Sequence, residues 1–314
     1  MWWQRIFPGN EEPYALKDGK FTPVLSDRAL RQLNRLQINA SRYQPSGRIG
    51  LRRSLRRTLD LNFREHRKYI PGDDIRYVDW KASGRHEQVF VKQSESPKGI
   101  LTYILIDISM SMSWGSPPKS QCMLELAAAL GYASIAHGDQ ILVIPFRESL
   151  SHPYGPISGK AQISSLIRYL GSLSFSGKTD FENSIRDFRR QYGGGGTVLI
   201  LSDLLWRGNL SNVLEQLPAP TWDVVLLHLL HADEIQPPRM GNVEVHDIET
   251  ENKINYDINQ KAIEQYAINL EQWKSNLEMI SMESNAFYTM IPTAWKLDLE
   301  IIPHLRSLDV LIPL

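Results

Sequence analysis

The feature that most constrains the fold of this chain is a succession of short, continuous apolar runs separated by longer amphipathic segments, from about residue 100 onward. Each run has the length of a strand that is buried on both faces, which is typical of parallel sheets. Strand, helix and strand in alternation predict a mostly parallel sheet with helices on both faces. The predicted strands are Thr102–Ile106, Gln140–Phe146, Thr197–Ser202, Val224–Leu230 and Phe287–Ile291.

The segments between these runs carry apolar residues at helical spacing. Around Leu150–Tyr154 a short antiparallel edge strand is expected, with Pro153 keeping it out of the sheet interior. Residues 242–258 are polar and predict a hairpin-like excursion. Helices are predicted at about Lys119–His137, Lys160–Gly171, Phe181–Tyr192 and Lys261–Glu283.

The first part of the chain differs in composition from the rest. It is rich in arginine, poor in apolar runs and interrupted by turns, so we expect residues 1–98 to form a smaller accessory region before an α/β domain at 99–314. Residues 28–92 hold sixteen Lys and Arg against six Asp and Glu, and residues 203–314 hold seven against seventeen. The basic half could face an acidic partner, or the two halves could face each other or solvent.

Bulk composition excludes several classes of protein. The 314 residues have a net charge of zero, 42% are hydrophobic and 22% are charged, as in an ordinary globular protein. No uncharged apolar run approaches the roughly 18–20 residues that cross a bilayer. A single cysteine fits a reducing compartment. We therefore expect a cytoplasmic protein, with membrane association only through partners, and we expect no nucleic-acid partner because the chain has no net basic charge.

Three oxygen-bearing side chains follow the first predicted strand directly: Asp107, Ser109 and Ser111. Ligands of open parallel sheets bind at the carboxyl ends of the strands, where the loops converge. Carboxylate and hydroxyl oxygens suit hard cations such as Mg²⁺. The same residues could instead cap a helix or complete a turn.

Two later positions should return to the same sheet edge. Thr179 precedes the helix predicted to begin at residue 181, and Asp203 directly follows the predicted strand Thr197–Ser202. Either could be a helix N-cap, and Asp180 could take the place of Thr179. Three loops that bring complementary oxygens to one edge nevertheless favour a metal site.

The D-x-S-x-S loop with a later threonine and a later aspartate resembles the metal-ion-dependent adhesion site (MIDAS) of von Willebrand factor A domains. The resemblance implies that Ser109, Ser111 and Thr179 coordinate Mg²⁺ or Mn²⁺ directly, with Asp107 and Asp203 acting directly or through water. It also implies that an acidic side chain of a partner protein completes the metal shell.

A second specific pattern lies in the accessory region, where Pro71-Gly72 predicts a type II turn. The charged and aromatic residues around the turn could pair there and form a structural corner, or they could bind a partner. These structural or partner-binding candidates are Arg64, Tyr69, Pro71, Gly72, Asp73, Asp74, Arg76, Asp79 and Trp80.

Around this turn the chain also carries an R-x-Y-x-P-G-D-D-x-R-x-x-D-W pattern. Together with the D-x-S-x-S loop, this pattern resembles an uncharacterised bacterial family that carries a von Willebrand factor A-like domain. Its members are typically encoded beside MoxR-type AAA+ ATPases, which implies an adaptor or chaperone-like partner of such an ATPase. The arginine-rich segment 48–57 departs from the glycine-rich run expected of the family.

We therefore expect a Mg²⁺- or Mn²⁺-dependent protein-binding module without enzymatic activity. The alternative is a metal-dependent phosphohydrolase or phosphotransferase that uses Asp107, because such enzymes also place an aspartate after the first strand. They commonly carry a second carboxylate two residues later, where this chain has Ser109, and a hydroxyl cannot replace that acid/base at neutral pH.

Overall fold

The computed structural model describes residues 21–39, 63–68, 83–84, 89–94, 101–237, 241–246 and 253–314. The chain divides into two compact units, one of Ser46–Gly99 and one of Met1–Pro45 with Ile100–Leu314. In the smaller unit, β2 (Phe63–Lys68) pairs antiparallel with β3 (Phe90–Ser94). The first segment of the predicted accessory region therefore groups with the α/β unit, and residues 46–99 form a unit of their own.

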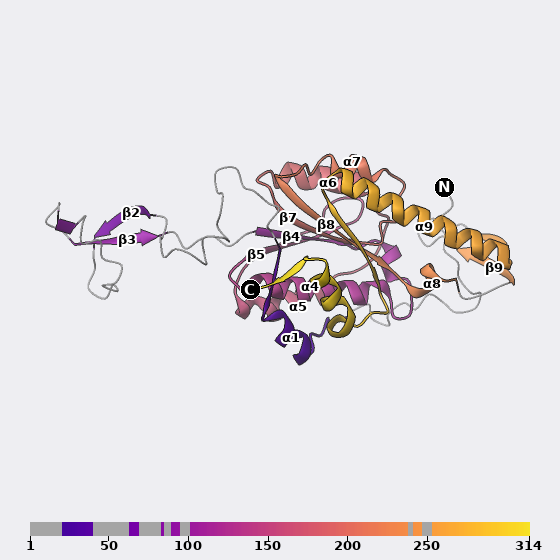
Figure 1. Ribbon diagram of the computed structural model, residues 1–314, viewed down its shortest axis with the longest axis horizontal. Coiled ribbons are helices and arrows are strands. Elements are labelled where there is room, and N and C mark those ends of the chain that lie inside the picture. The colour runs from indigo at the N-terminus through magenta and orange to yellow at the C-terminus, as the bar shows by residue number, and fades with distance from the viewer. Residues whose placement is uncertain are drawn as a thin grey trace. The chain divides into compact units, whose positions relative to one another are not determined.

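A six-stranded sheet with the strand order β11-β8-β7-β4-β5-β6 forms the centre of the larger unit (Figure 1). Five strands are parallel, and β6 at one edge is antiparallel to β5. The strands are β4 (Leu101–Asp107), β5 (Gln140–Phe146), β6 (Tyr154–Ile157), β7 (Gly196–Ser202), β8 (Trp222–Leu230) and β11 (Phe287–Pro292).

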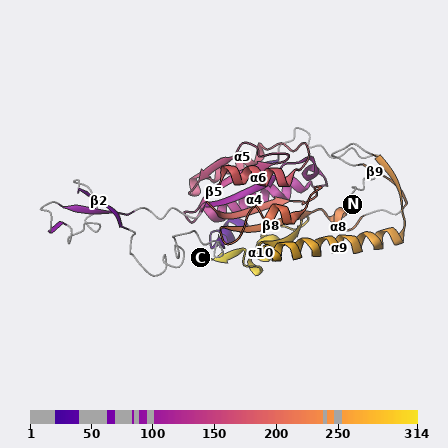
Figure 2. The same cartoon turned by 90° about the horizontal axis from the view of Figure 1, so that it is seen from above.

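Helices cover both faces of this sheet, and a separate hydrophobic core lies on each face (Figures 1 and 2). Alternate residues of β4 show the division, since Ile104 joins one core and Leu105 the other. Burial on both faces explains why the strands are continuously apolar. One face packs against α1 (Asp27–Leu33), α4 (Lys119–Ile135), α5 (Ile163–Gly171) and α10 (Ile302–Ser307), and the other against α6 (Phe181–Gln191), α7 (Leu210–Leu214) and α9 (Gln260–Glu283).

Helix α4 is buried almost all round, because the sheet lies on one side of it and α1 and α5 lie on others. At Gly131 the helix approaches α5 closely, since a Cβ atom there would lie 2.6 Å from Cδ2 of Leu166.

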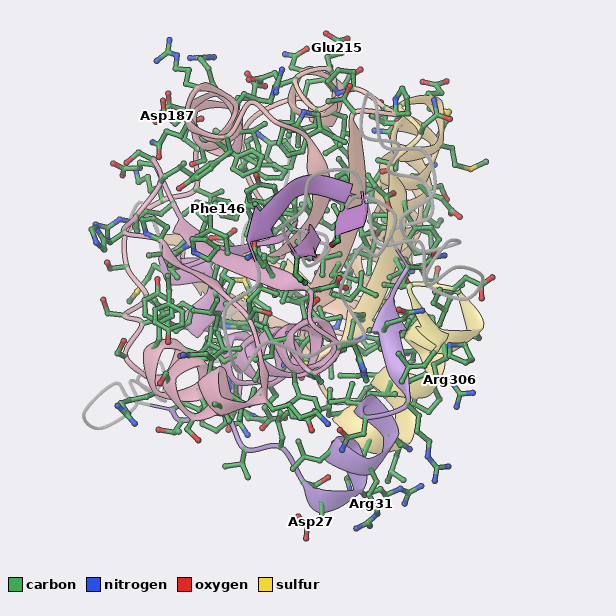
Figure 3. All side chains as sticks on the ribbon, turned by 90° about the vertical axis from the view of Figure 1, so that its left-hand side faces the viewer. Asp27, Arg31, Phe146, Asp187, Glu215 and Arg306 are labelled. Atoms are coloured by element: carbon green, nitrogen blue, oxygen red, sulfur yellow. The ribbon has the colours of Figure 1, made fainter. Side chains whose placement is uncertain are left out.

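Charged residues occupy the outer faces of the surrounding helices. Figure 3 shows Asp187 and Glu215 at the periphery of the molecule, whereas Phe146 at the end of β5 lies inside it.

These observations confirm the predicted fold class, a mostly parallel sheet with helices on both faces. The position predicted for the edge strand was wrong. Leu150 forms only an isolated bridge to Phe146, and the edge strand β6 begins at Tyr154. A tight turn, in which the Arg147 amide donates to the Ser149 carbonyl oxygen, takes up the residues between β5 and that bridge.

Two smaller antiparallel pairs complete the described part of the larger unit. Strands β9 (Gly241–His246) and β10 (Lys253–Ile258) pair where the polar excursion was expected. Strand β1 (Leu36–Ile38) pairs with β12 (Leu311–Pro313). Short helical segments are η2 (Met110–Ser113), η3 (Lys160–Gln162), α8 (Ala232–Ile235) and η4 (Leu297–Ile301). Within the described ranges, each helix is too short or too polar to cross a membrane.

Candidate metal centre

The candidate site begins where β4 ends, at Asp107, and continues into the loop before α4. The Ser109 amide donates to Asp107 Oδ1 at 3.0 Å, and the hydroxyl oxygens of Ser109 and Ser111 lie 2.9 Å apart. All three residues are fully buried. The loop is held from the backbone, because the Ile108 amide donates to the carbonyl oxygen of Phe146. The D-x-S-x-S spacing therefore gathers three oxygen-bearing side chains above the strand end.

Thr179 reaches the same carboxylate from the loop before α6. Its hydroxyl lies 3.2 Å from Asp107 Oδ1 and 3.3 Å from Oδ2. The loop is joined to the first one by the Met110 amide, which donates to the Gly177 carbonyl oxygen. Asp180 instead caps α6 by accepting from the Asn183 amide at 3.0 Å. Of these two neighbours, it is thus Thr179 that contacts Asp107.

The end of β7 supplies the third loop. The Ser202 hydroxyl donates to Asp107 Oδ2 at 2.6 Å, and Asp203 Oδ1 accepts from the Leu205 amide at 3.0 Å. Burial and, after it, the charge of Asp203 together raise the pKa of Asp107 to about 6, although the hydrogen bonds from Ser202 and Ser109 oppose the shift. The structure therefore brings the residues of all five predicted positions to one sheet edge.

Two charged residues beside this cluster were not predicted from the sequence. Lys119, the first residue of α4, is fully buried, and its ammonium lies 2.7 Å from Asp203 Oδ2 and 2.7 Å from Glu234 Oε1. Glu234 Oε2 in turn accepts from the His231 amide in the capping box of α8. Little in the sequence indicates this pairing, because a lysine at the start of a helix normally lies in solvent.

The oxygen donors fit a hard divalent cation. Two carboxylates and three hydroxyls form the set, and Mg²⁺ and Mn²⁺ prefer such ligands. The raised pKa of Asp107 reflects buried negative charge that a divalent cation would compensate. Over the described ranges, no three His, Cys, Asp or Glu side chains are grouped so as to hold a metal ion, so a site here would depend on hydroxyl ligands.

Of the second candidate set, the structure describes one residue. Arg64 lies in β2 of the smaller unit. The remaining candidates and the arginine-rich segment 48–57 lie outside the described residues: Tyr69, Pro71, Gly72, Asp73, Asp74, Arg76, Asp79 and Trp80.

The two histidines near the site have different local roles. His228 in β8 is fully buried with its Nδ1 2.7 Å from the Tyr288 hydroxyl, and burial lowers its pKa to about 3. His231 caps α8 through its side chain, and its ring packs edge-on against Trp114 of the loop that follows Asp107. A Cβ atom on Gly115 would lie 2.5 Å from that ring, so the glycine permits this contact.

Comparison with known proteins finds relatives in mycobacteria. Uncharacterised proteins of Mycobacterium tuberculosis and Mycobacterium bovis are each 24% identical over 201 residues, which is 59% of this chain. The chain covers 60% of the length of each of these relatives.

Several solved structures are similar to the chain at low identity. The hypothetical protein BatB from Bacteroides thetaiotaomicron is 16% identical, with a TM-score of 0.39 over 67% of this chain and 98% of that one. A mussel byssus proximal thread matrix protein with a zinc-occupied MIDAS motif is 14% identical, with a TM-score of 0.39 over 69% of this chain and 47% of that one. The SpRpn10 VWA domain is 10% identical, with a TM-score of 0.37 over 65% and 94%.

A family match covers most of the chain and includes the whole candidate site. It runs over residues 65–274, and Asp107, Ser109, Ser111, Thr179 and Asp203 all lie within it. On this match, the chain belongs to the family described as protein of unknown function DUF58.

Proposed function

We propose that the protein is a protein-binding module that depends on Mg²⁺ or Mn²⁺ and uses a MIDAS-type site. Asp107, Ser109, Ser111, Thr179 and Asp203 would hold the ion. One observation carries the proposal: three loops from separate parts of the chain converge on the Asp107 carboxylate, through Ser109, Thr179 and Ser202. A helix cap or a turn would explain one of these loops, but not the convergence of all three.

The surroundings of the oxygens support binding from one side. Asp107, Ser109, Ser111 and Asp203 are buried, whereas Thr179 is half-buried and the residue Met110 is 37% exposed. A bound cation would supply a Lewis-acidic centre for an acidic side chain of the partner. Ser202 holds Asp107 in place, and three neutral hydroxyls leave much of the ion's charge available to that side chain.

We propose that this function needs no catalysis. The residue two positions after Asp107 is Ser109, whose hydroxyl hydrogen-bonds with Ser111 and cannot act as a general acid or base at neutral pH. A metal-dependent phosphohydrolase that uses Asp107 is the alternative, and the experiment below distinguishes the two.

The proposed partner is a MoxR-type AAA+ ATPase, for which the chain would act as an adaptor or chaperone-like subunit. The resemblance of its R-x-Y-x-P-G-D-D-x-R-x-x-D-W pattern to the family with such genomic neighbours supports this choice. Metal-dependent capture of the ATPase would join this partner to the candidate site.

Calorimetric titration of Mn²⁺ into wild type and Asp107→Asn tests the site. We expect saturable binding to wild type and none to the variant. Asp180→Asn is the matched control, because it removes a carboxylate of the same sheet edge while asparagine can still cap α6. Equal binding by wild type and Asp107→Asn contradicts the proposal.

Two further assays address activity and partner. Turnover of p-nitrophenyl phosphate by wild type with Mn²⁺, abolished in Asp107→Asn, would favour the phosphohydrolase. Capture of a purified MoxR-type AAA+ ATPase should occur with Mg²⁺ and be lost with EDTA. Capture that EDTA and Asp107→Asn leave unchanged would separate the partner from the metal site.

A further inference from the structure

A lysine ammonium is paired with Asp203, the second carboxylate of the candidate metal site. Lys119 is fully buried and bridges two acidic side chains, Asp203 and Glu234, at 2.7 Å each. An unpaired ammonium in this position would be strongly destabilising, so the ion pairs are required for its burial. Lys119 also directly follows the loop that holds Ser109 and Ser111.

The contacts of Asp203 show what the lysine does to the site. Oδ2 accepts from Lys119, and Oδ1 accepts from the Leu205 amide. Each carboxylate oxygen of Asp203 thus already accepts a hydrogen bond, so a cation that approaches Asp203 must compete with an existing donor. Lys119 also adds a positive charge close to the place of the ion, which opposes metal binding.

Glu234 has the opposite influence. It accepts from Lys119 through Oε1 and is held by the His231 amide through Oε2. The carboxylate of Glu234 neutralises part of the ammonium's charge and shares the ammonium equally with Asp203, at 2.7 Å from each. Lys119 and Glu234 should therefore shift metal affinity in opposite directions, although both belong to the same buried cluster.

We propose that Lys119 is a resident counter-ion of the metal site: it neutralises Asp203 when no metal is bound, allows the site to form without metal, and weakens divalent-cation binding. Glu234 acts as a positioning residue that moderates this effect. The inference rests on the proposed metal function and adds to it that metal exchange is reversible and does not unfold the protein.

The test compares Lys119→Met with Glu234→Gln by Mn²⁺ calorimetry and by thermal unfolding in EDTA and in Mn²⁺. Methionine keeps the length of the side chain and removes its charge. Without the ammonium, Mn²⁺ should bind at least about tenfold more tightly than to wild type. In EDTA the melting temperature of Lys119→Met should be lower than that of wild type. The increase in melting temperature when Mn²⁺ is added should be larger for Lys119→Met than for wild type.

Glu234→Gln should bind Mn²⁺ more weakly than wild type, while its amide oxygen can still accept from the His231 amide. A merely structural cluster would weaken binding in both variants. Shifts in the same direction, or no shift in either variant, overturn the inference. Because Glu234→Gln removes charge without removing volume, it also serves if Lys119→Met fails to fold, and unchanged or tighter Mn²⁺ binding then overturns the inference.

The result for wild type separates this inference from the proposed function. If wild type binds Mn²⁺ through Asp107 and both variants weaken binding, only the inference fails. If wild type does not bind but Lys119→Met gains binding that Asp107→Asn abolishes, the lysine is a counter-ion and the proposed function fails. Absence of binding in all of these proteins overturns both.

Discussion

Burial of His228 makes a quantitative prediction about acid stability. The imidazole is fully buried in β8, and burial lowers its pKa to about 3. In the unfolded chain a histidine has a pKa of about 6.5, so below that pH the unfolded state binds a proton that the folded state does not. The free energy of unfolding must therefore fall as the pH falls from about 6.5 towards 3.

The size of the effect follows from the two pKa values. Between pH 7 and pH 5 the unfolded histidine changes from about one quarter to almost fully protonated, while the folded one stays neutral. Integration over this range gives a loss of about 2 kcal/mol from this one residue. The slope approaches about 1.4 kcal/mol per pH unit near pH 5.

Urea unfolding in EDTA at pH 7, 6 and 5 measures the effect for wild type and His228→Asn. Asparagine can replace the contact between Nδ1 and the Tyr288 hydroxyl and has no proton to gain. The pH-dependent loss should be about 2 kcal/mol smaller in His228→Asn than in wild type. His152→Asn on the surface is the matched control and should follow wild type. If the difference in unfolding free energy between wild type and His228→Asn stays constant within about 0.5 kcal/mol from pH 7 to pH 5, the reasoning is refuted, because the expected change in that difference is about 2 kcal/mol.

Three further substitutions test packing and hydrogen bonding. Ser202→Ala removes the 2.6 Å hydrogen bond to Asp107 and should lower the free energy of unfolding, measured in urea, by about 1–3 kcal/mol. A loss below about 0.5 kcal/mol would show that another interaction replaces this hydrogen bond. Phe188→Ala removes a core ring whose centroid lies 5.3 Å from that of Trp222. Guanidinium unfolding should show a loss of about 3–5 kcal/mol in the free energy of unfolding, and a loss below about 1 kcal/mol would contradict this expectation. Asp180→Ala removes the N-cap of α6 and should lower the stability by about 0.5–2 kcal/mol in thermal unfolding. Asp180→Asn should stay close to wild type, because asparagine also caps helices. Equal losses in both variants would show that loss of the cap is not the cause.

The strand pattern made most of the sheet predictable. Apolar runs such as Gln140–Phe146 coincide with strands because burial on both faces demands continuous apolar sequence. The convergence of Asp107 and Asp203 followed from the same logic, since parallel strands place their carboxyl ends at one edge. Thr179 was expected there because it precedes the helix α6 of the same doubly wound sheet. Short elements such as α7 were not predicted, because five residues carry too little periodicity.

The burial of Lys119 was not predictable from local sequence. Lysine at the first position of a helix is normally solvated, and the pairing carboxylates lie 84 and 115 residues away in the chain. Only the order of strands in the sheet brings the end of β7 and the start of α8 to the same helix terminus. Such a charge cluster depends on three-dimensional proximity, which no spacing rule encodes.

The pairing of β1 with β12 sets an order on how the chain can fold during synthesis. Leu36 lies opposite Pro313, so this pair joins strands that the ribosome makes at the beginning and at the end of the larger unit. Closing so long a loop has a large entropic cost, which contacts already formed in between reduce. The sheet and α4 can assemble while Leu311–Pro313 are still unmade. We therefore expect β1 to pair with β12 late in folding. In ribosome-bound chains that stop before β12, we expect proteases to cleave at the exposed β1.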